Sequence, residues 1–201
     1  WYADPTWHAN PNVSLYTDTA IYFLTWESSG STKRLGLEND VDFSGYTPAN
    51  YFLNESRQDY YSNYYGGTYQ SSSGSFLYDS EFTEGNGWFG PTFTSPYTVS
   101  TSTANIYSSG PDAIAKCVLI GTNLQSHAVS VKIGSGSVNN LTYPAIKVTK
   151  LSYNVPLTDL GSSTTAFTFS PSGPPPDRNA IGYISIKYAH TFNLGGASTF
   201  K

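Results

Sequence analysis

The alternation of hydrophobic and polar residues predicts β-strands along most of the second half of the chain. The longest nearly apolar run covers residues 113–120, contains one lysine and is followed by a Gly-Thr-Asn turn. A short apolar run between turn residues is typical of a strand buried on both faces. The next run, 129–133, alternates strictly, as a strand with one wet face does. We expect these two strands to form the central pair of an antiparallel sandwich.

Four other segments are also expected to be strands, and no segment shows helical periodicity beyond about two turns. The clearest alternation ends at a Gly-Gly pair and is expected to be the final strand, whereas a Thr/Ser-rich segment is expected at a sheet edge. The four segments are Thr98–Tyr107 (the edge), Leu141–Tyr153, Thr165–Phe169 and Gly182–Leu194 (the final strand). The fold class predicted is all-β: an antiparallel β-sandwich, jelly-roll or Ig-like, with long Tyr/Gly/Ser-rich loops and little or no helix.

The N-terminal segment has a pattern of its own. Residues 1–13 are aromatic, and two X-Pro steps favour extended backbone there. Residues 14–26 are expected to form a long strand whose second half is nearly all apolar. We therefore predict an arm and first strand in 1–26 and a sandwich domain in 27–201. The strand either pairs within its own domain or completes the sheet of a neighbouring copy by β-addition. The apolar contacts of such a donor strand would be Leu15, Ile21, Phe23 and Trp26.

Composition favours a secreted protein on a cell surface. Charged residues make up 12% of the chain, about half the usual ~25%, and aromatic residues make up 16%, led by 17 tyrosines. The chain contains no methionine, which predicts a mature form after removal of a signal peptide. No apolar run approaches the ~20 residues of a membrane span. The single cysteine, Cys117, excludes an intrachain disulfide and is expected to be a small buried hydrophobe.

The charge is divided unequally between the two halves of the chain. Residues 1–110 contain 3 basic and 11 acidic residues, a net charge of -8, and residues 111–201 contain 7 and 3, a net charge of +4. This division indicates either an uneven solvated surface or head-to-tail contact between copies, in which complementary charges set orientation. The basic residues are scattered among aliphatic strands, which argues against a nucleic-acid partner.

One acidic segment is a candidate metal site. Glu38, Asp40 and Asp42 alternate with other residues, so an extended backbone places them on one side. Ca²⁺ is the cation that such oxygen ligands would hold. The glycine and final glutamate of an EF-hand loop are missing. The alternative is a solvated acidic edge, and no other cofactor is expected.

Aromatic side chains gather in residues 46–78 and at one tryptophan beyond. A tyrosine has a flat apolar body and a polar tip. That combination suits stacking on a sugar, a protein interface or packing against the protein's own glycans; the alternative is a partly buried loop. The candidate aromatic surface comprises Tyr60, Tyr61, Tyr64, Tyr65, Tyr69 and Trp88.

Three N-x-[ST] sequons make Asn12, Asn54 and Asn140 candidate glycosylation sites. Chance supplies two or three sequons in a chain this rich in Asn, Ser and Thr. The three histidines are far apart and are expected in the core or at an edge rather than on a metal. No catalytic motif is present, so we do not expect an enzyme.

These patterns favour a structural subunit of a pilus-like extracellular filament or surface assembly that polymerises head to tail with itself. The first alternative is a secreted carbohydrate-binding module or adhesin head. A viral capsid or fibre jelly roll follows, and a secreted glycan-active enzyme comes last.

Overall fold

The computed structural model describes residues 7–10, 44–67, 69–72, 75–78, 82–193 and 196. These residues form β-strands and one short 3-10 helix, η1. The elements are β1 (Phe52–Asp59), β2 (Asn63–Gly66), β3 (Tyr69–Ser72), β4 (Ser75–Tyr78), β5 (Asn86–Phe89), β6 (Tyr97–Ser102), β7 (Ala113–Gly121), β8 (Ser126–Ile133), β9 (Val138–Pro144), β10 (Val148–Val155), η1 (Leu157–Asp159), β11 (Thr164–Pro171) and β12 (Asn179–His190).

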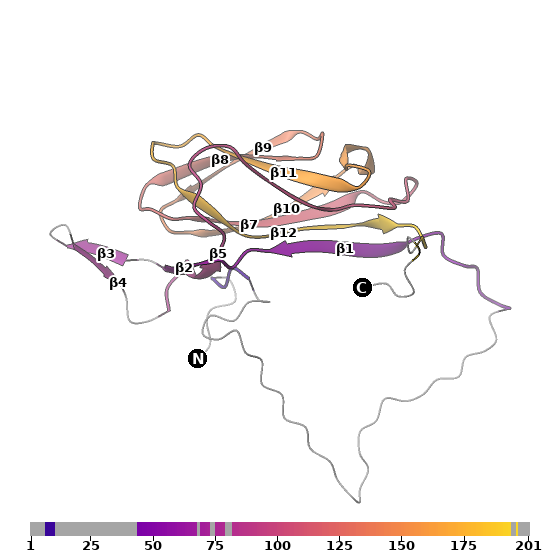
Figure 1. The fold of residues 1–201 in the computed structure, drawn as a ribbon, viewed down its shortest axis with the longest axis horizontal. Helices are drawn as coiled ribbons and strands as arrows, with labels where there is room; N and C mark the ends of the chain where they lie inside the picture. Colours follow the sequence, from indigo (N-terminus) through magenta and orange to yellow (C-terminus); the bar gives the residue numbers. More distant parts are fainter. Residues whose placement is uncertain are drawn as a thin grey trace, which may run out of the picture.

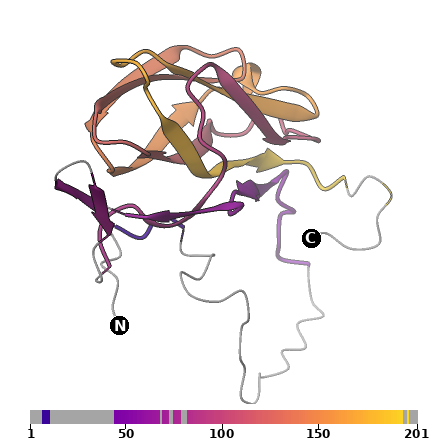
Figure 2. The same cartoon turned by 60° about the vertical axis from the view of Figure 1, so that its left-hand side comes forward.

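Two four-stranded antiparallel sheets face each other and form a β-sandwich (Figure 1 and Figure 2). The first sheet has the order β1-β12-β7-β10, and the second has the order β6-β11-β8-β9. The predicted fold class, an antiparallel β-sandwich with little helix, is confirmed. Two small two-stranded sheets, β2-β5 and β3-β4, lie beside this sandwich.

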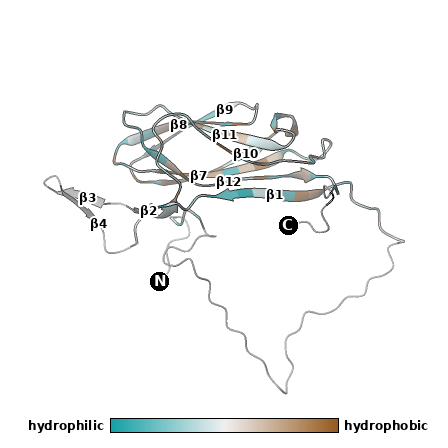
Figure 3. Cartoon of the chain, viewed as in Figure 1, coloured by the Kyte–Doolittle hydropathy of each residue, from teal (hydrophilic) through white to brown (hydrophobic). Residues whose placement is uncertain are grey.

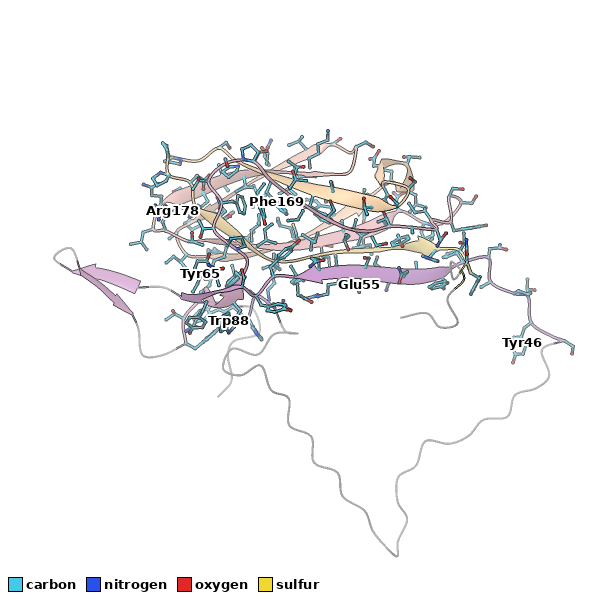
Figure 4. The ribbon with its side chains drawn as sticks, in the orientation of Figure 1. Tyr46, Glu55, Tyr65, Trp88, Phe169 and Arg178 are labelled. Atoms are coloured by element: carbon cyan, nitrogen blue, oxygen red, sulfur yellow. The ribbon has the colours of Figure 1, made fainter. Side chains whose placement is uncertain are left out.

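The main core fills the space between the two sheets. Its largest side chains come from the central strands and are fully buried, because alternate residues of each strand point inward. Burying one such side chain contributes about 1.5–3 kcal/mol to folding. The core includes Leu119, Val131, Phe167, Phe169, Ile184 and Ile186; Phe169 is labelled between the sheets in Figure 4.

The expectation that residues 113–120 and 129–133 pair with each other is wrong. β7 belongs to the first sheet and β8 to the second, and each is a central strand there. The turn between them carries the chain from one sheet to the other. β7 is buried on both faces only from Cys117 onward, since Ile114 and Lys116 are exposed on its outer face.

The segment 141–153 is not one strand either. It is divided between β9 in the second sheet and β10 in the first. Ala145, between them, has a positive φ of 45°, a conformation that interrupts a strand. The expected edge strand is confirmed as β6, and the expected final strand is confirmed as β12, which lies between β1 and β7 inside its sheet.

A second, smaller core lies on the outer face of the first sheet, where the β2-β5 sheet covers the ends of β7 and β12. Phe89 of β5 is fully buried there against Val118, Ile120 and Ala180, together with Ala9. This cover explains why only the second half of β7 is buried on both faces.

The short segment 7–10 is held to the same outer face by polar contacts. The amide of Asn10 donates a hydrogen bond of 2.7 Å to Asp59, and the guanidinium of Arg57 donates one of 2.8 Å to the Asn10 carbonyl oxygen. That guanidinium also forms an ion pair with Asp59 at 2.8 Å and lies 3.7 Å from the ring centre of Tyr183. Residues 7–10 therefore pack on their own sandwich.

Candidate functional site

The sandwich has two long openings, one where β1 faces β6 and one where β10 faces β9. We call the β1–β6 opening the sealed side, because polar side chains close it. The hydroxyls of Ser56 and Thr101 share a hydrogen bond of 2.7 Å across it, and the Tyr188 hydroxyl of the first sheet donates one of 2.9 Å to the Ala104 carbonyl beyond β6. Within the first sheet, the amide of Asn54 donates one of 3.3 Å to the same Tyr188 hydroxyl. The arrowhead half of β1 is hydrophilic in Figure 3.

We call the β9–β10 opening the open side, because apolar side chains line it and remain partly exposed. Leu141 of β9 and Leu151 and Tyr153 of β10 pack on the main core but are only half-buried. The hydroxyl of Thr149, on the same face of β10, is buried without a hydrogen-bond partner among the described residues. Burial, and secondarily the nearby Cys117 thiol, raises the pKa of Tyr153.

One backbone edge of β10 has no neighbouring strand in the described part of the chain. The Val148 N–H points to this edge, since it donates a hydrogen bond of 3.0 Å to the Glu84 carboxylate rather than to β7. Alternate residues of an antiparallel strand direct their N–H and C=O groups to the same side. The backbone groups of Ser152 and Asn154 therefore also point to the free edge.

The open side is closed off at both of its ends. At one end the chain passes from β9 to β10, where the Ala145 N–H donates to the Gln125 carbonyl at 2.8 Å. At the other end η1 packs on the β8–β9 turn, and the Ser135 N–H donates to the Asp159 carbonyl at 2.9 Å. Between these two ends runs β10, a strand of eight residues that is ~27 Å long.

Basic side chains border this site on the outer face of the first sheet. Lys150 is exposed there on β10, and Lys116 is exposed on the neighbouring strand β7. The first 43 residues contain six acidic and two basic residues, a net charge of -4. The acidic N-terminal part of the chain and the basic surroundings of the open side thus have complementary charge.

A buried polar network holds β9 at the end of the open side. His127 Nδ1 lies 2.7 Å from Asp177 Oδ1, the Asn179 amide donates to the same oxygen at 2.8 Å, and the Tyr143 hydroxyl donates to Asn179 Oδ1. Tyr143 belongs to β9 and Asn179 to β12, so the network joins the two sheets. The prediction that His127 and His190 lie in the core or at an edge is confirmed, since both are buried.

The ionisation of Asp177 reflects two opposed effects. Burial alone raises the pKa of this carboxyl, but hydrogen bonds from His127, Asn179 and the backbone of Gly173 and Ala128 outweigh burial, so the pKa is lowered. The Tyr143 phenol has a raised pKa because it is buried and because Asp177 lies near it. With four hydrogen-bond donors from β8, β12 and the loop before it, the Asp177 carboxylate holds these parts of the chain together.

Cys117 is buried in the main core, as expected. Burial raises the pKa of its thiol to about 12, which leaves it protonated at neutral pH.

The predicted glycosylation sites have different surroundings. Asn140 lies on the edge strand β9 with its side chain exposed, and its Oδ1 accepts a hydrogen bond of 2.6 Å from Ser130. The amide of Asn54 points inward to Tyr188, so a glycan there would displace a contact of the sealed side. Asn12 lies outside the described residues.

The structure divides the predicted aromatic surface into two groups. Tyr60 and Tyr65 pack against the two cores, and burial, with Tyr97 second, raises the pKa of Tyr60 to about 12. Tyr61 and Tyr64 are exposed. Trp88 lies opposite Tyr64 on the neighbouring strand. Tyr69 begins β3, and its side chain is not among those the structure describes.

Two predicted sites lie outside the described residues and stay predictions: the donor-strand positions Leu15, Ile21, Phe23 and Trp26, and the acidic group Glu38, Asp40 and Asp42. Within the described ranges, no group of three or more His, Cys, Asp or Glu side chains is arranged to hold a metal ion. In those same ranges no helix has the length and apolar character that a membrane crossing needs.

Sequence reasoning did not identify the open side. Leu151 and Tyr153 alternate with polar residues as any half-buried strand does, so the pattern does not say that their inner face is incompletely covered. The open side is revealed by two structural facts: β9 and β10 are edge strands of opposite sheets, and the positive φ of Ala145 separates them. Neither fact could be read from the sequence.

No known protein family and no curated protein sequence matches the chain. Among solved structures, dimeric latent PorU from Porphyromonas gingivalis is similar with a TM-score of 0.52 and 15% identity, over 74% of this chain and 14% of that one. The chain thus corresponds to a small part of PorU.

Two shorter domains are also similar. The CBM36-1 domain of a multidomain xylanase, from the hindgut metagenome of Trinervitermes trinervoides, has a TM-score of 0.37 and 14% identity, over 74% of this chain and 100% of that one. The CBM35 of Cellvibrio japonicus Abf62 has a TM-score of 0.39 and 13% identity, over 71% and 100%. At such identities the likeness is one of fold, and that fold is the β-sandwich.

Proposed function

We propose that the protein is a structural subunit of an extracellular filament or surface assembly, in which a strand from residues 14–26 of one copy occupies the open side of the next. The observation that supports this function is the absence of a bridge on the open side. Both sides have half-buried apolar side chains and unpartnered strand edges among the described residues, but the Ser56–Thr101 hydrogen bond joins the two sheets only on the sealed side. An unpartnered strand edge is a template for pairing with another chain.

Strand addition would satisfy both features at once. The backbone of the added strand would bond to the free edge of β10 at Ser152 and Asn154, and alternate side chains would point into the opening. Leu15, Ile21 and Phe23 have the same parity in the sequence, so an extended backbone directs all three to one face. They would cover the half-buried Leu141, Leu151 and Tyr153.

In the sequence, the proposed donor segment follows residues 7–10, which are anchored on their own sandwich. Asn10 is held to its own sandwich by Arg57 and Asp59, and the described structure resumes at residue 44. The intervening residues, acidic overall, would approach the basic border of the next copy's open side. Each copy then both donates and accepts, which gives a heterologous interface that propagates without closing.

The donor face tests this function. The double variant Ile21→Asp, Phe23→Asp places two carboxylates where the apolar contacts should be, and the matched control Tyr22→Asp changes the opposite parity. We expect negative-stain electron microscopy to show filaments for the control and none for the double variant. Filaments of the double variant equal to wild type would contradict the proposal.

A mixing experiment distinguishes donation to a neighbour from pairing within one chain. The donor-defective double variant keeps an intact open side, and Ser152→Pro keeps an intact donor segment while it removes an N–H at the free edge. Each alone should be monomeric in light scattering, and the mixture should form one-to-one dimers. A mixture that stays monomeric would show that the segment packs in its own sandwich.

We also propose that Asn140 carries a glycan in the exported protein, because its side chain is exposed on an edge strand. Intact mass spectrometry of native material should show a mass that falls by one glycan in Asn140→Gln. A mass that changes only by the substitution itself would contradict this proposal.

A further inference from the structure

The outer face of the β2-β5 sheet carries an aromatic pair that the sandwich does not need for its own packing. The inner face of this sheet supplies the second core, with Phe89 and Tyr65 in an edge-to-face contact of 5.7 Å between ring centres. Alternation along the strands places Tyr64 and Trp88 on the opposite face. Figure 4 shows Tyr65 directed toward the sandwich and Trp88 on the other side.

The two outer rings form one surface. Tyr64 and Trp88 are direct cross-strand partners, and their ring centres are 5.5 Å apart at an interplanar angle of 64°. Tyr64 is 50% exposed and Trp88 is half-buried, so part of each side chain is accessible to solvent. The pair presents an apolar face and an apolar edge to solvent.

Uncharged polar groups border this aromatic surface. The Tyr64 hydroxyl donates a hydrogen bond of 2.5 Å to Asn86 Oδ1, which fixes the orientation of the Asn86 amide and leaves its NH₂ group as a donor. Asn86 shares the outer face with Trp88, since the two residues are two positions apart on β5. The face therefore combines two aromatic rings with an amide and a phenol hydroxyl, and these three side chains carry no charge.

We propose that Tyr64, Trp88 and Asn86 form a binding site for a neutral pyranose unit of a glycan chain. A pyranose ring has an apolar C–H face that packs on an aromatic ring and a rim of hydroxyls that hydrogen-bonds to amides, so its chemistry matches both parts of the site. A charged peptide or an anionic polymer would find no ion-pair partner among these side chains. This site lies on the β2-β5 sheet and does not depend on the proposed strand addition.

The test is isothermal titration calorimetry of the protein with cello-, xylo-, manno- and galacto-oligosaccharides. Sugar concentrations of up to about 10 mM detect dissociation constants into the millimolar range. We expect saturable binding of at least one of these sugars. Trp88→Ala should weaken that binding about tenfold or more, and Asn86→Ala, which leaves the rings in place, should weaken it by a smaller factor. Tyr46→Ala changes a tyrosine that is 68% exposed outside this sheet and should leave binding unchanged.

The folded state of each variant is checked by circular dichroism, and Asn86→Ala decides the test if Trp88→Ala does not fold. Absence of saturable binding to all four sugar types would overturn the proposal, as would binding that neither variant weakens. Titration of Asn140→Gln separates the two sources of the sugar. A glycan of a neighbouring copy would compete for the site, so its removal should strengthen binding of the free sugar, whereas an exogenous polysaccharide alone predicts no change.

Discussion

The two long openings of the sandwich are built from different chemistry. On the sealed side, Ser56 and Thr101 join β1 to β6 by a hydrogen bond, and the Tyr188 hydroxyl of the first sheet donates to the Ala104 carbonyl. On the open side, Leu141, Leu151 and Tyr153 leave part of their apolar surface in water. The polar groups that face each other on the sealed side satisfy their hydrogen bonds within one chain. The exposed apolar surface of the open side leaves water only if another segment covers it.

The difference also determines which side resists an added strand. Inserting a strand at the sealed side would break the Ser56–Thr101 hydrogen bond and leave partly buried hydroxyls without partners, at about 1–3 kcal/mol each. Insertion at the open side breaks no such pair and removes apolar surface from water at about 25 cal/mol per Å². Under the proposed assembly, the added strand would therefore favour the open side over the sealed side.

The largest effect is expected where the buried network holds β9 in place. Asp177→Ala leaves His127 and Asn179 without their acceptor in a buried environment, and each buried polar group left without a partner costs about 1–3 kcal/mol. Chemical denaturation should show this loss in the free energy of unfolding. The matched control Asp112→Ala removes an exposed carboxylate and should change stability by less than about 0.5 kcal/mol. Equal effects of the two variants would show that the network does not hold β9.

The same network predicts a stability loss in acid. The pKa of Asp177 is lower in the folded protein than in the unfolded chain, so its contribution is present above the unfolded pKa of about 3.9 and disappears as the pH falls through the folded value. We expect the melting temperature of the wild type to fall between pH 5 and pH 2 by more than that of Asp177→Asn. Parallel curves for the two proteins would exclude Asp177 as the cause.

A side chain of the open side should matter more in the assembly than in the monomer. Leu151→Ala removes apolar surface that is only half-buried in one copy, which costs about 1 kcal/mol there. An added strand would cover the rest and roughly double that cost. Melting of polymeric wild type and variant, compared with melting of both in the Ser152→Pro background, measures the two values. The same shift in both states would place Leu151 outside the interface.

The smallest effect concerns the sealed side. Ser56→Ala removes one hydrogen bond across it and leaves the Thr101 hydroxyl without this partner, a loss of about 1 kcal/mol. Ser152→Ala on the open side removes an exposed hydroxyl and keeps the backbone N–H, so it should be neutral in both stability and polymerisation. A difference scan by calorimetry resolves the two. If Ser152→Ala proved as destabilising as Ser56→Ala, the contrast between the two sides would be lost.

The strands could be predicted from the sequence because alternation reports local burial. β8 and β12 follow the predicted pattern closely, and Cys117 and His127 were correctly expected to be buried. The pairing of strands could not be predicted, because hydrophobic periodicity does not indicate which sheet a strand joins. The sequence pattern predicted β7 and β8 as partners, but they belong to opposite sheets.

The residues of the two proposed sites and of the buried polar network were the hardest to identify from the sequence. β2 and β5 have four residues each, too few for periodicity to stand out in a tyrosine-rich region. His127 and Asp177 meet across 50 residues of sequence, and only the fold brings them together. The open side depends on two edge strands lying beside each other without covering one another, which is a property of topology rather than of any local pattern.

The most direct test compares two proline substitutions on matched edge serines. Ser152 points its N–H to the free edge of β10. The Thr103 N–H donates to Ser163 at 2.9 Å, so alternation turns the Ser100 N–H to the free edge of β6, on the sealed side. Negative-stain electron microscopy of both variants, each shown to be folded, should reveal filaments for Ser100→Pro and only monomers for Ser152→Pro. Filaments from both variants, or none from the wild type, would contradict assembly through the open side.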